Sequence, residues 1–144
     1  MPRHDRILCP ENHYAQQEIA PMADTSFIKR KFLDLPYAHL SNSRKLDIFL
    51  PENGEGPFPV ILSIHGGAFM GGEKGDTQVM PMLEGLEQGF AVISMNYRMS
   101  GEAKWPALIY DGKAVVRWIR ANAKKFCLAP DRIVSWGGSA GGYL

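Results

Sequence analysis

The sequence has little cysteine, no excess of charge of one sign and no long hydrophobic run. Its 144 residues hold two cysteines, Cys9 and Cys127, whose wide separation matches neither a metal site nor a redox pair. The 16 basic and 15 acidic residues nearly cancel, so we expect neither nucleic acid nor an anionic membrane as the main partner. The apolar runs are also too short to cross a bilayer. A repeat protein is excluded as well, because no segment recurs.

The first residues lack the apolar stretch of a secretory leader. Residues 1–14 mix charged side chains with proline, so we expect a cytoplasmic protein. Residues 1–25 show no hydrophobic period and are expected to form a tail or a strap packed on the body. Hydrophobic residues make up 45% of the chain, which is enough for a true core. We therefore expect one folded unit over residues 26–144.

Hydrophobic patterning predicts an α/β protein with a mainly parallel, doubly wound sheet. Alternation over residues 27–35 and 45–50 indicates two strands that form an antiparallel pair. Nearly continuous apolar runs at residues 60–64, 90–95 and 133–136 are typical of strands buried on both faces.

Two helices are expected between these buried strands. The first covers residues 77–88, with Pro81 in its first turns and Gly89 as its stop. The second covers residues 106–125, where apolar side chains recur at the helical period. We expect a turn at Pro130 and Asp131 before the last strand. Alternation of strand and helix is the pattern of a doubly wound sheet.

Glycine is concentrated in two places, and these are where chemistry is expected. The chain has 15 glycines, more than an average composition of about 7% gives. Glycine is favoured where the backbone adopts positive φ or closely approaches another group. Nine of the glycines fall in two clusters, at positions 66, 67, 71, 72 and 75 and at positions 137, 138, 141 and 142.

The second cluster contains the pattern G-x-S-x-G, formed by Gly137, Ser139 and Gly141. It follows a predicted strand and precedes a predicted helix that begins near Ala140. A serine on such a sharp turn is held in a strained conformation with its hydroxyl exposed. Side chains two residues before and after it would clash, which explains the two glycines. The pattern predicts a nucleophilic serine, although a glycine-rich turn with an incidental serine is the alternative.

The first cluster, His65-Gly66-Gly67-Ala68, directly follows a buried strand and matches the HGGG-type loop of esterases. We expect the amides of Gly66 and Gly67, together with that of Ala140, to bind the oxyanion of a tetrahedral intermediate. His65 is not expected to be the general base. It lies at the end of its own strand, and we expect its ring to support the glycine loop through hydrogen bonds.

Five landmarks in order resemble the BD-FAE-like and hormone-sensitive-lipase-like branch of the α/β-hydrolase superfamily, which includes feruloyl and acetylxylan esterases. They lie at residues 65–69, 96–98, 105–107 with Asp111, 129–133 and 138–142. The resemblance implies the strand order 1-2-4-3-5-6-7-8, with Ser139 as nucleophile. It implies a small carboxylic ester as substrate and neither a metal nor an organic cofactor. It also implies structural roles for Tyr97, Arg98 and Asp111.

The sequence departs from this family in two respects. Gly138 stands where an acidic residue or histidine is common. The family's acid and histidine follow the serine, and residues 140–144 contain neither. We therefore expect the N-terminal half of a hydrolase domain, truncated after its nucleophile and inactive alone. An arylformamidase-like or peptidase-like hydrolase and a non-catalytic binding module remain alternatives, and the pattern predicts no oligomeric state.

Overall fold

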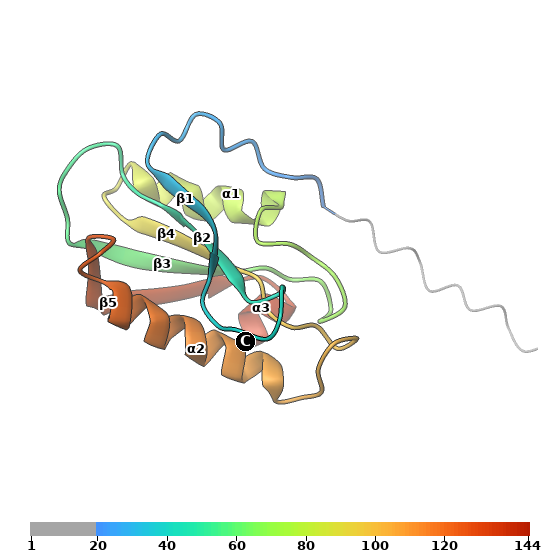
Figure 1. Cartoon of the computed structure of the whole chain (residues 1–144). Helices are drawn as coiled ribbons and strands as arrows, with labels where there is room; N and C mark the ends of the chain where they lie inside the picture. Colours follow the sequence, from blue (N-terminus) through green and yellow to red (C-terminus); the bar gives the residue numbers. More distant parts are fainter. Residues whose placement is uncertain (1–19) are drawn as a thin grey trace, which may run out of the picture.

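The computed structural model describes residues 20–144, and its central element is a five-stranded mixed sheet (Figure 1). The strands are β1 (Lys31–Pro36), β2 (Lys45–Phe49), β3 (Phe58–Ile64), β4 (Ala91–Met95) and β5 (Leu128–Gly137). They lie in the order β1-β2-β4-β3-β5, which is the order that the resemblance implies. The expected antiparallel pair is present as β1 and β2.

The direction of the strands differs between the two sides of the sheet. Strand β3 runs parallel to both β4 and β5, whereas β2 runs antiparallel to β1 and β4. The prediction of a mainly parallel sheet is thus confirmed for the β4–β3–β5 part. Within residues 20–144 the sheet as a whole is mixed, because the antiparallel pairings equal the parallel ones in number.

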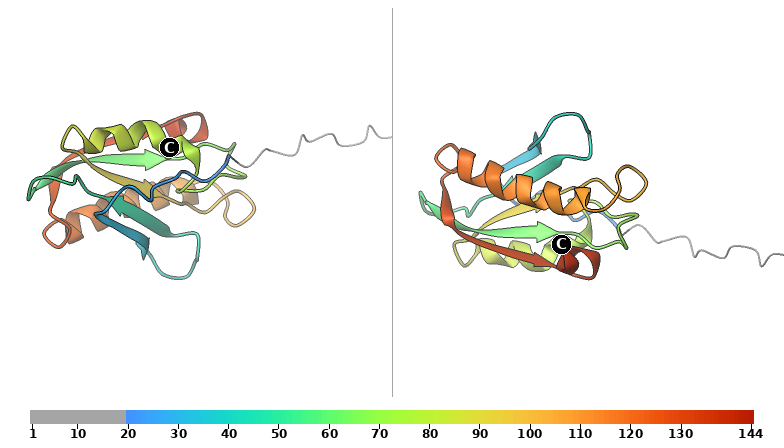
Figure 2. Two further views of the ribbon diagram at one scale, coloured as in Figure 1. Left: turned by 90° about the horizontal axis from the view of Figure 1, so that it is seen from above. Right: turned by 90° about the horizontal axis from the view of Figure 1, so that it is seen from below.

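Helices cover both faces of the sheet, as expected for a doubly wound fold. Helix α2 (Ala107–Asn122) lies on one face, and the short helix α1 (Met80–Leu83) lies on the other (Figure 2). Two 3₁₀ turns flank α1, namely η1 (Thr77–Val79) and η2 (Glu84–Leu86). The expected continuous helix over residues 77–88 is therefore wrong, because this segment consists of three short pieces.

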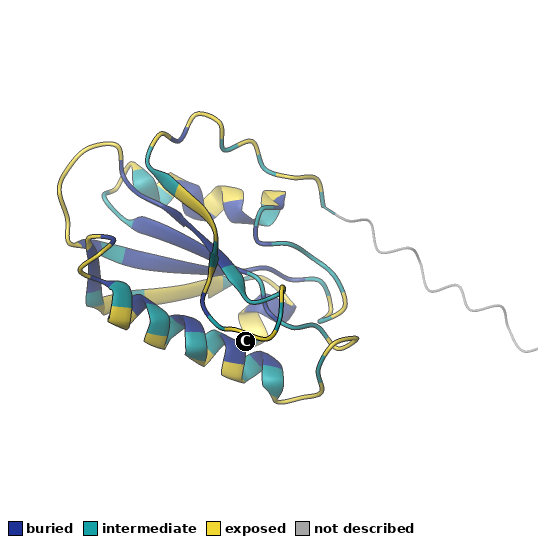
Figure 3. Cartoon of the chain, viewed as in Figure 1, coloured by how far each residue is buried: buried dark blue, intermediate teal, exposed yellow. Residues whose placement is uncertain are grey.

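The two faces of the sheet carry two hydrophobic clusters. Alternate strand residues such as Ile48, Leu62 and Ile93 point to α2 and pack with Val115 and Ile119. The residues between them point to α1, and this smaller cluster consists of Ile28, Phe49, Ile61, Val79, Met82, Leu83 and Val92. Strands β3 and β4 are buried along almost all of their length, whereas β5 carries exposed residues (Figure 3). The carboxyl end of β3 is thus held rigidly inside the core.

Strand β5 begins earlier than its apolar run suggests. The expected turn at Pro130 and Asp131 is wrong, because both residues lie inside β5. The pairing with β3 is irregular there, since Phe58 opposes Leu128 and Val60 opposes Ile133. From Ile133 to Gly137 the pairing with β3 is regular, so the residues that follow Gly137 lie at the carboxyl end of β3.

Residues 20–25 contact the loop that precedes α1. The amide of Ala23 donates to the carbonyl oxygen of Gly75, and the amide of Thr77 donates to that of Pro21. Met22 also forms an antiparallel bridge with Asp76. The predicted tail or strap over residues 1–25 otherwise lies outside the described residues, as does Cys9, and the boundary at residue 26 stays a prediction.

Candidate active site

Ser139 occupies the turn between β5 and the helical turn α3 (Ala140–Tyr143). Its backbone adopts φ 52° and ψ −121°, a conformation that costs a residue with a side chain on the order of 1–3 kcal/mol. The residue is exposed, while Ala140 and Gly141 behind it are buried. The strained turn that G-x-S-x-G predicts is confirmed.

The two glycines that flank Ser139 are required by close backbone contacts. A methyl group on Gly141 would lie 2.0 Å from the carbonyl oxygen of Ile64, at the end of β3. A methyl group on Gly137 would lie 2.5 Å from the carbonyl carbon of Gly141 and 2.7 Å from the same Ile64 oxygen. Gly138 has open space around it. The chain therefore turns so tightly against β3 that positions 137 and 141 exclude any side chain.

The His65–Gly72 loop leaves β3 and lies directly beside this turn. A methyl group on Gly66 would lie 3.5 Å from the Cβ atom of Ser139 and 3.0 Å from the carbonyl oxygen of Gly138. The loop then bends through positive φ values at Gly67 (126°), Ala68 (52°) and Phe69 (63°). The carbonyl oxygen of Gly67 closes this bend by accepting the amides of Met70 and Gly71.

Of the three amides predicted to bind an oxyanion, two are free. Within residues 20–144, the amides of Gly67 and Ala140 donate no hydrogen bond. The amide of Gly66 instead donates to the side-chain oxygen of Gln78 at 2.8 Å. The contribution of Gly66 to an oxyanion site therefore disagrees with the observed hydrogen bonding. The roles of Gly67 and Ala140 remain predictions that this geometry permits.

The His65 ring contacts the glycine loop and the ring of Tyr97. It is buried, it stacks on Tyr97 with 4.5 Å between ring centroids, and its Nδ1 lies 2.8 Å from the carbonyl oxygen of Gly66. Because a carbonyl oxygen only accepts, Nδ1 carries the proton in this contact. Burial lowers the pKa of His65, which favours the neutral ring. This contact with the loop is the kind that we expected, although its effect on the loop stays a prediction.

The second ring nitrogen of His65 makes no contact with the serine turn that would identify it as a base. Nε2 is buried and has no hydrogen-bond partner among residues 20–144. The Tyr97 hydroxyl donates to the carbonyl oxygen of His65 at 2.9 Å and fixes the same strand end. The Ser139 hydroxyl makes no hydrogen bond to a histidine or a carboxylate within the described part of the chain. Within residues 20–144 the turn at Ser139 therefore has no histidine or carboxylate in hydrogen-bond contact with its hydroxyl.

Asp111 is engaged in ion pairs and is not a candidate for the acid of a triad. It is fully buried on α2, and Arg98 holds its carboxylate at 2.8 Å while Arg44 lies 3.1 Å from it. The backbone amide of Arg98 also donates to it. Hydrogen bonding to Asp111 raises the pKa of Arg98 further. Asp111 therefore ties the segment after β4 to α2, in line with the structural role that the resemblance implies.

Aromatic side chains form a wall beside the serine. Tyr143, one helical turn after Ser139, packs edge-on against Phe69 of the glycine loop with 6.0 Å between ring centroids. Trp105 lies 5.7 Å from the same tyrosine ring. Trp105 and Tyr143 are exposed. The planes of these rings are inclined to one another by 58–78°, so the wall is an uneven apolar surface on the helical turn that follows Ser139.

Residues 20–144 contain no helix of the length and apolar character that a membrane span requires. The same residues hold no group of three or more acidic, histidine or cysteine side chains arranged for a metal ion. The cytoplasmic location expected from the sequence stays a prediction.

The sequence is similar to one family model and to curated proteins. The family model described as BD-FAE matches residues 46–144. The probable carboxylic ester hydrolase LipM of Mycobacterium tuberculosis is 35% identical over 114 residues, which cover 77% of this chain and 26% of LipM. Esterase LipQ of the same organism is 35% identical over 115 residues, which cover 77% of this chain and 27% of LipQ.

Solved structures agree. A truncated carbohydrate esterase from gut microbiota superposes with a TM-score of 0.73 at 38% identity, covering 86% of this chain and 44% of that one. A bifunctional GH43-CE protein of Bacteroides eggerthii gives a TM-score of 0.73 at 41% identity, covering 78% and 15%. The chain thus spans about a quarter of the curated relatives LipM and LipQ. It belongs to the BD-FAE family, among the carboxylesterase relatives of the α/β-hydrolase fold.

Proposed function

We propose that the complete protein hydrolyses carboxylic esters through an acyl-enzyme formed at Ser139. The observation that carries this proposal is the strained, exposed Ser139 beside a loop whose Gly67 amide is free, with the free Ala140 amide next to it. Attack of the serine oxygen on the ester carbonyl gives a tetrahedral oxyanion. These two amides would stabilise it, and loss of one such donor typically costs about 2.7–4 kcal/mol of transition-state stabilisation.

The reaction also needs a base, and within residues 20–144 no histidine or carboxylate bonds to the Ser139 hydroxyl. A serine hydroxyl is a weak nucleophile without an adjacent base. The proposal therefore assigns the acid and the histidine of the triad to residues other than the 144 described by this sequence. The fact that LipM and LipQ are roughly four times longer than the matched region supports this assignment. The 144-residue chain alone is expected to show little or no turnover.

The substrate class follows from the wall and from the relatives. We propose short-chain acyl esters or esters carried on a carbohydrate as substrates. Sugar rings and aryl groups present apolar faces, and the exposed rings of Trp105 and of Tyr143, on the helical turn that follows Ser139, would each stack on such a face. One structural relative is described as a carbohydrate esterase and another as a bifunctional GH43-CE protein, which supports the same class.

Hydrolysis of p-nitrophenyl acetate by the complete protein tests the proposal. The Ser139→Ala variant should lose at least about 10³-fold in kcat, because the acyl-enzyme cannot form. Ser135→Ala is the matched control, since Ser135 is an exposed serine on β5 four residues earlier, and it should keep the wild-type rate. Equal rates for the two variants would show that the activity does not depend on Ser139. A complete protein with no esterase activity would favour a binding module.

A further inference from the structure

Gln78 forms a chain of hydrogen bonds that begins at a buried carboxylate and ends at the glycine loop. Its side-chain oxygen accepts the amide of Gly66 at 2.8 Å, and its side-chain nitrogen donates to Asp76 Oδ2 at 2.9 Å. Asp76 is 1% exposed, and its other oxygen accepts the backbone amide of Gln78. No motif in the sequence marks Gln78, and the ester chemistry described above does not use it.

The orientation of the Gln78 carboxamide is fixed by its two partners. A backbone amide can only donate, and an ionised carboxylate can only accept. The reversed carboxamide would place its NH₂ group against the Gly66 N–H and its oxygen against the Asp76 carboxylate. Only one orientation therefore satisfies both ends, and among uncharged side chains only a carboxamide of this length supplies an acceptor and a donor in these positions.

Gln78 lies within the immediate surroundings of Ser139. A methyl group on Gly66 would be 3.0 Å from the Gln78 side-chain oxygen and 3.5 Å from Ser139 Cβ. The hydrogen bond to Gln78 occupies the Gly66 amide and fixes the plane of the peptide group between His65 and Gly66. The next amide in the loop is that of Gly67, which is free. The direction of the Gly67 amide thus depends on how firmly the peptide before it is held.

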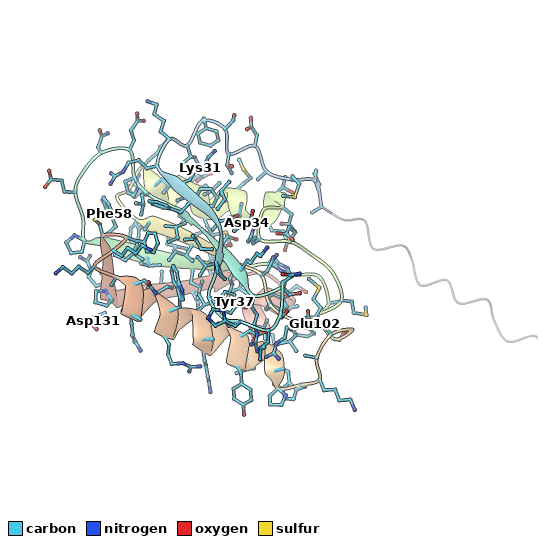
Figure 4. The ribbon with its side chains drawn as sticks, in the orientation of Figure 1. Lys31, Asp34, Tyr37, Phe58, Glu102 and Asp131 are labelled. Atoms are coloured by element: carbon cyan, nitrogen blue, oxygen red, sulfur yellow. The ribbon has the colours of Figure 1, made fainter. Side chains whose placement is uncertain are left out.

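The segment that carries Asp76, where the hydrogen-bonded series begins, is itself attached to the sheet. Lys74, which is 7% exposed, places its Nζ 3.0 Å from a carboxylate oxygen of Asp34 and of Asp47. Asp34 lies on β1 and is labelled in Figure 4. Asn96, after β4, accepts the Lys74 amide at 2.6 Å. A segment held at so many points gives Gln78 a fixed position from which to hold the loop.

From this geometry we infer that Gln78 is a positioning residue of the ester hydrolysis. It withholds Gly66 from the oxyanion site and aims the Gly67 amide at the carbonyl oxygen that reacts with Ser139. The inference rests on the proposed function. A role confined to capping η1 does not explain the contact, because Asp76 caps that turn through the backbone amide of Gln78 and needs no glutamine side chain.

Kinetics of the complete protein on p-nitrophenyl acetate test the inference. Gln78→Met keeps the length of the side chain but removes both hydrogen bonds, and kcat should fall by about 10–100-fold, as misplacement of a reacting geometry by about 1 Å does. KM should change less than about threefold, because the ground-state ester does not depend on the oxyanion site. Gln88→Met, at an exposed glutamine after η2, is the matched control and should leave both constants unchanged.

A second variant separates positioning from simple structural support. In Gln78→Glu the charged carboxylate still accepts the Gly66 amide but repels Asp76. When it is protonated, it can accept from Gly66 and donate to Asp76, so kcat relative to wild type should recover as the pH falls. A ratio that is independent of pH, or a Gln78→Met enzyme with wild-type kcat, would overturn the inference while leaving Ser139-dependent hydrolysis in place.

Amide NMR of the 144-residue chain gives a readout that requires no catalysis. In Gln78→Met the Gly66 amide proton should shift upfield and exchange faster with solvent, and the Gly67 resonance should change or broaden. The Gln88→Met spectrum should match the wild type at both glycines. Unchanged Gly66 and Gly67 resonances in Gln78→Met would overturn the inference even if the protein hydrolyses no ester.

Discussion

Replacing Gly141 by alanine perturbs the closest contact between the serine turn and the sheet. The new methyl group would lie 2.0 Å from the carbonyl oxygen of Ile64 and 2.9 Å from that of His65. An ordinary carbon–oxygen contact is about 3.3 Å, so the turn must move by about 1.3 Å. Overpacking of this kind costs about 1–3 kcal/mol. Because the obstacle is the backbone of buried β3, we expect about 3 kcal/mol of lost unfolding free energy.

Urea denaturation of the 144-residue chain measures this loss. With an m-value of about 2 kcal/mol/M, the midpoint should fall by about 1.5 M. Gly138→Ala is the matched control, because its methyl group meets open space, and its unfolding free energy should stay within about 0.5 kcal/mol of wild type. Alanine is the better helix former by about 1 kcal/mol, so intrinsic propensity alone would stabilise Gly141→Ala. A Gly141→Ala midpoint equal to that of Gly138→Ala would refute the contact.

Three further predictions concern the unfolding free energy. Ala68→Gly removes a side chain from positive φ and should raise the unfolding free energy, measured with urea, by about 0.5 kcal/mol. Ala114→Gly, inside α2, is the control and should lower it by about 1 kcal/mol. Changes of the same sign in the two variants would contradict this prediction. Asp111→Ala leaves Arg98 without its buried partner and should cost about 3 kcal/mol by the same assay; a loss below about 0.5 kcal/mol would show that the pair is unimportant. Because the pKa of His65 is lowered in the folded chain, the unfolded chain binds a proton more readily at this residue. The unfolding free energy should therefore fall as the pH drops below about 6.5. The fall should be steeper in wild type than in His65→Gln. Identical pH profiles would argue against a buried neutral ring.

The parts of the fold that the sequence predicted are those with strong local patterns. Strands β2, β3 and β4 appear as alternating or continuous apolar runs, and α2 appears as a long run of helical period. The turn at Ser139 was predictable because the glycines at positions 137 and 141 are required by close contacts with each other and with the end of β3. The fold class follows from these elements alone.

The segment between β3 and β4 was predicted incorrectly because its shape is set by tertiary contacts. Gly85 packs so closely that a methyl group there would lie 2.6 Å from the Ile61 side chain of β3. The segment consists of η1, α1 and η2, and it packs this closely on the sheet. Gly89 ends the segment with φ 82°, and this stop was predicted. Periodicity detects the apolar face of such a segment but not its distance from the sheet.

The start of β5 was missed for a related reason. Proline lacks an amide hydrogen and is tolerated in a strand where that position needs no hydrogen bond. Within residues 20–144 β5 pairs only with β3, and Pro130 lies in the irregular part of that pairing. Which strands pair with β5 is decided by the tertiary fold and cannot be read from the local sequence. The pair Pro130-Asp131 alone therefore favoured a turn.

The site shows the same division between local and tertiary information. The motifs gave Ser139 and the loop beside it, but they also gave Gly66 as an oxyanion donor. The structure adds what the motif could not show, because Gln78, twelve residues further along the chain, accepts the Gly66 amide. A pattern of glycines states where the backbone is accessible. It does not state which amide another side chain has already taken.

A crystal structure of the complete protein after reaction with a phosphonate ester tests the central claim most directly. We predict a single phosphonyl group on Ser139 Oγ, with its phosphoryl oxygen about 2.7–3.1 Å from the amide nitrogens of Gly67 and Ala140. The Gly66 amide should remain bound to Gln78. A phosphonyl group on another residue, or a phosphoryl oxygen that faces away from both amides, would contradict the account.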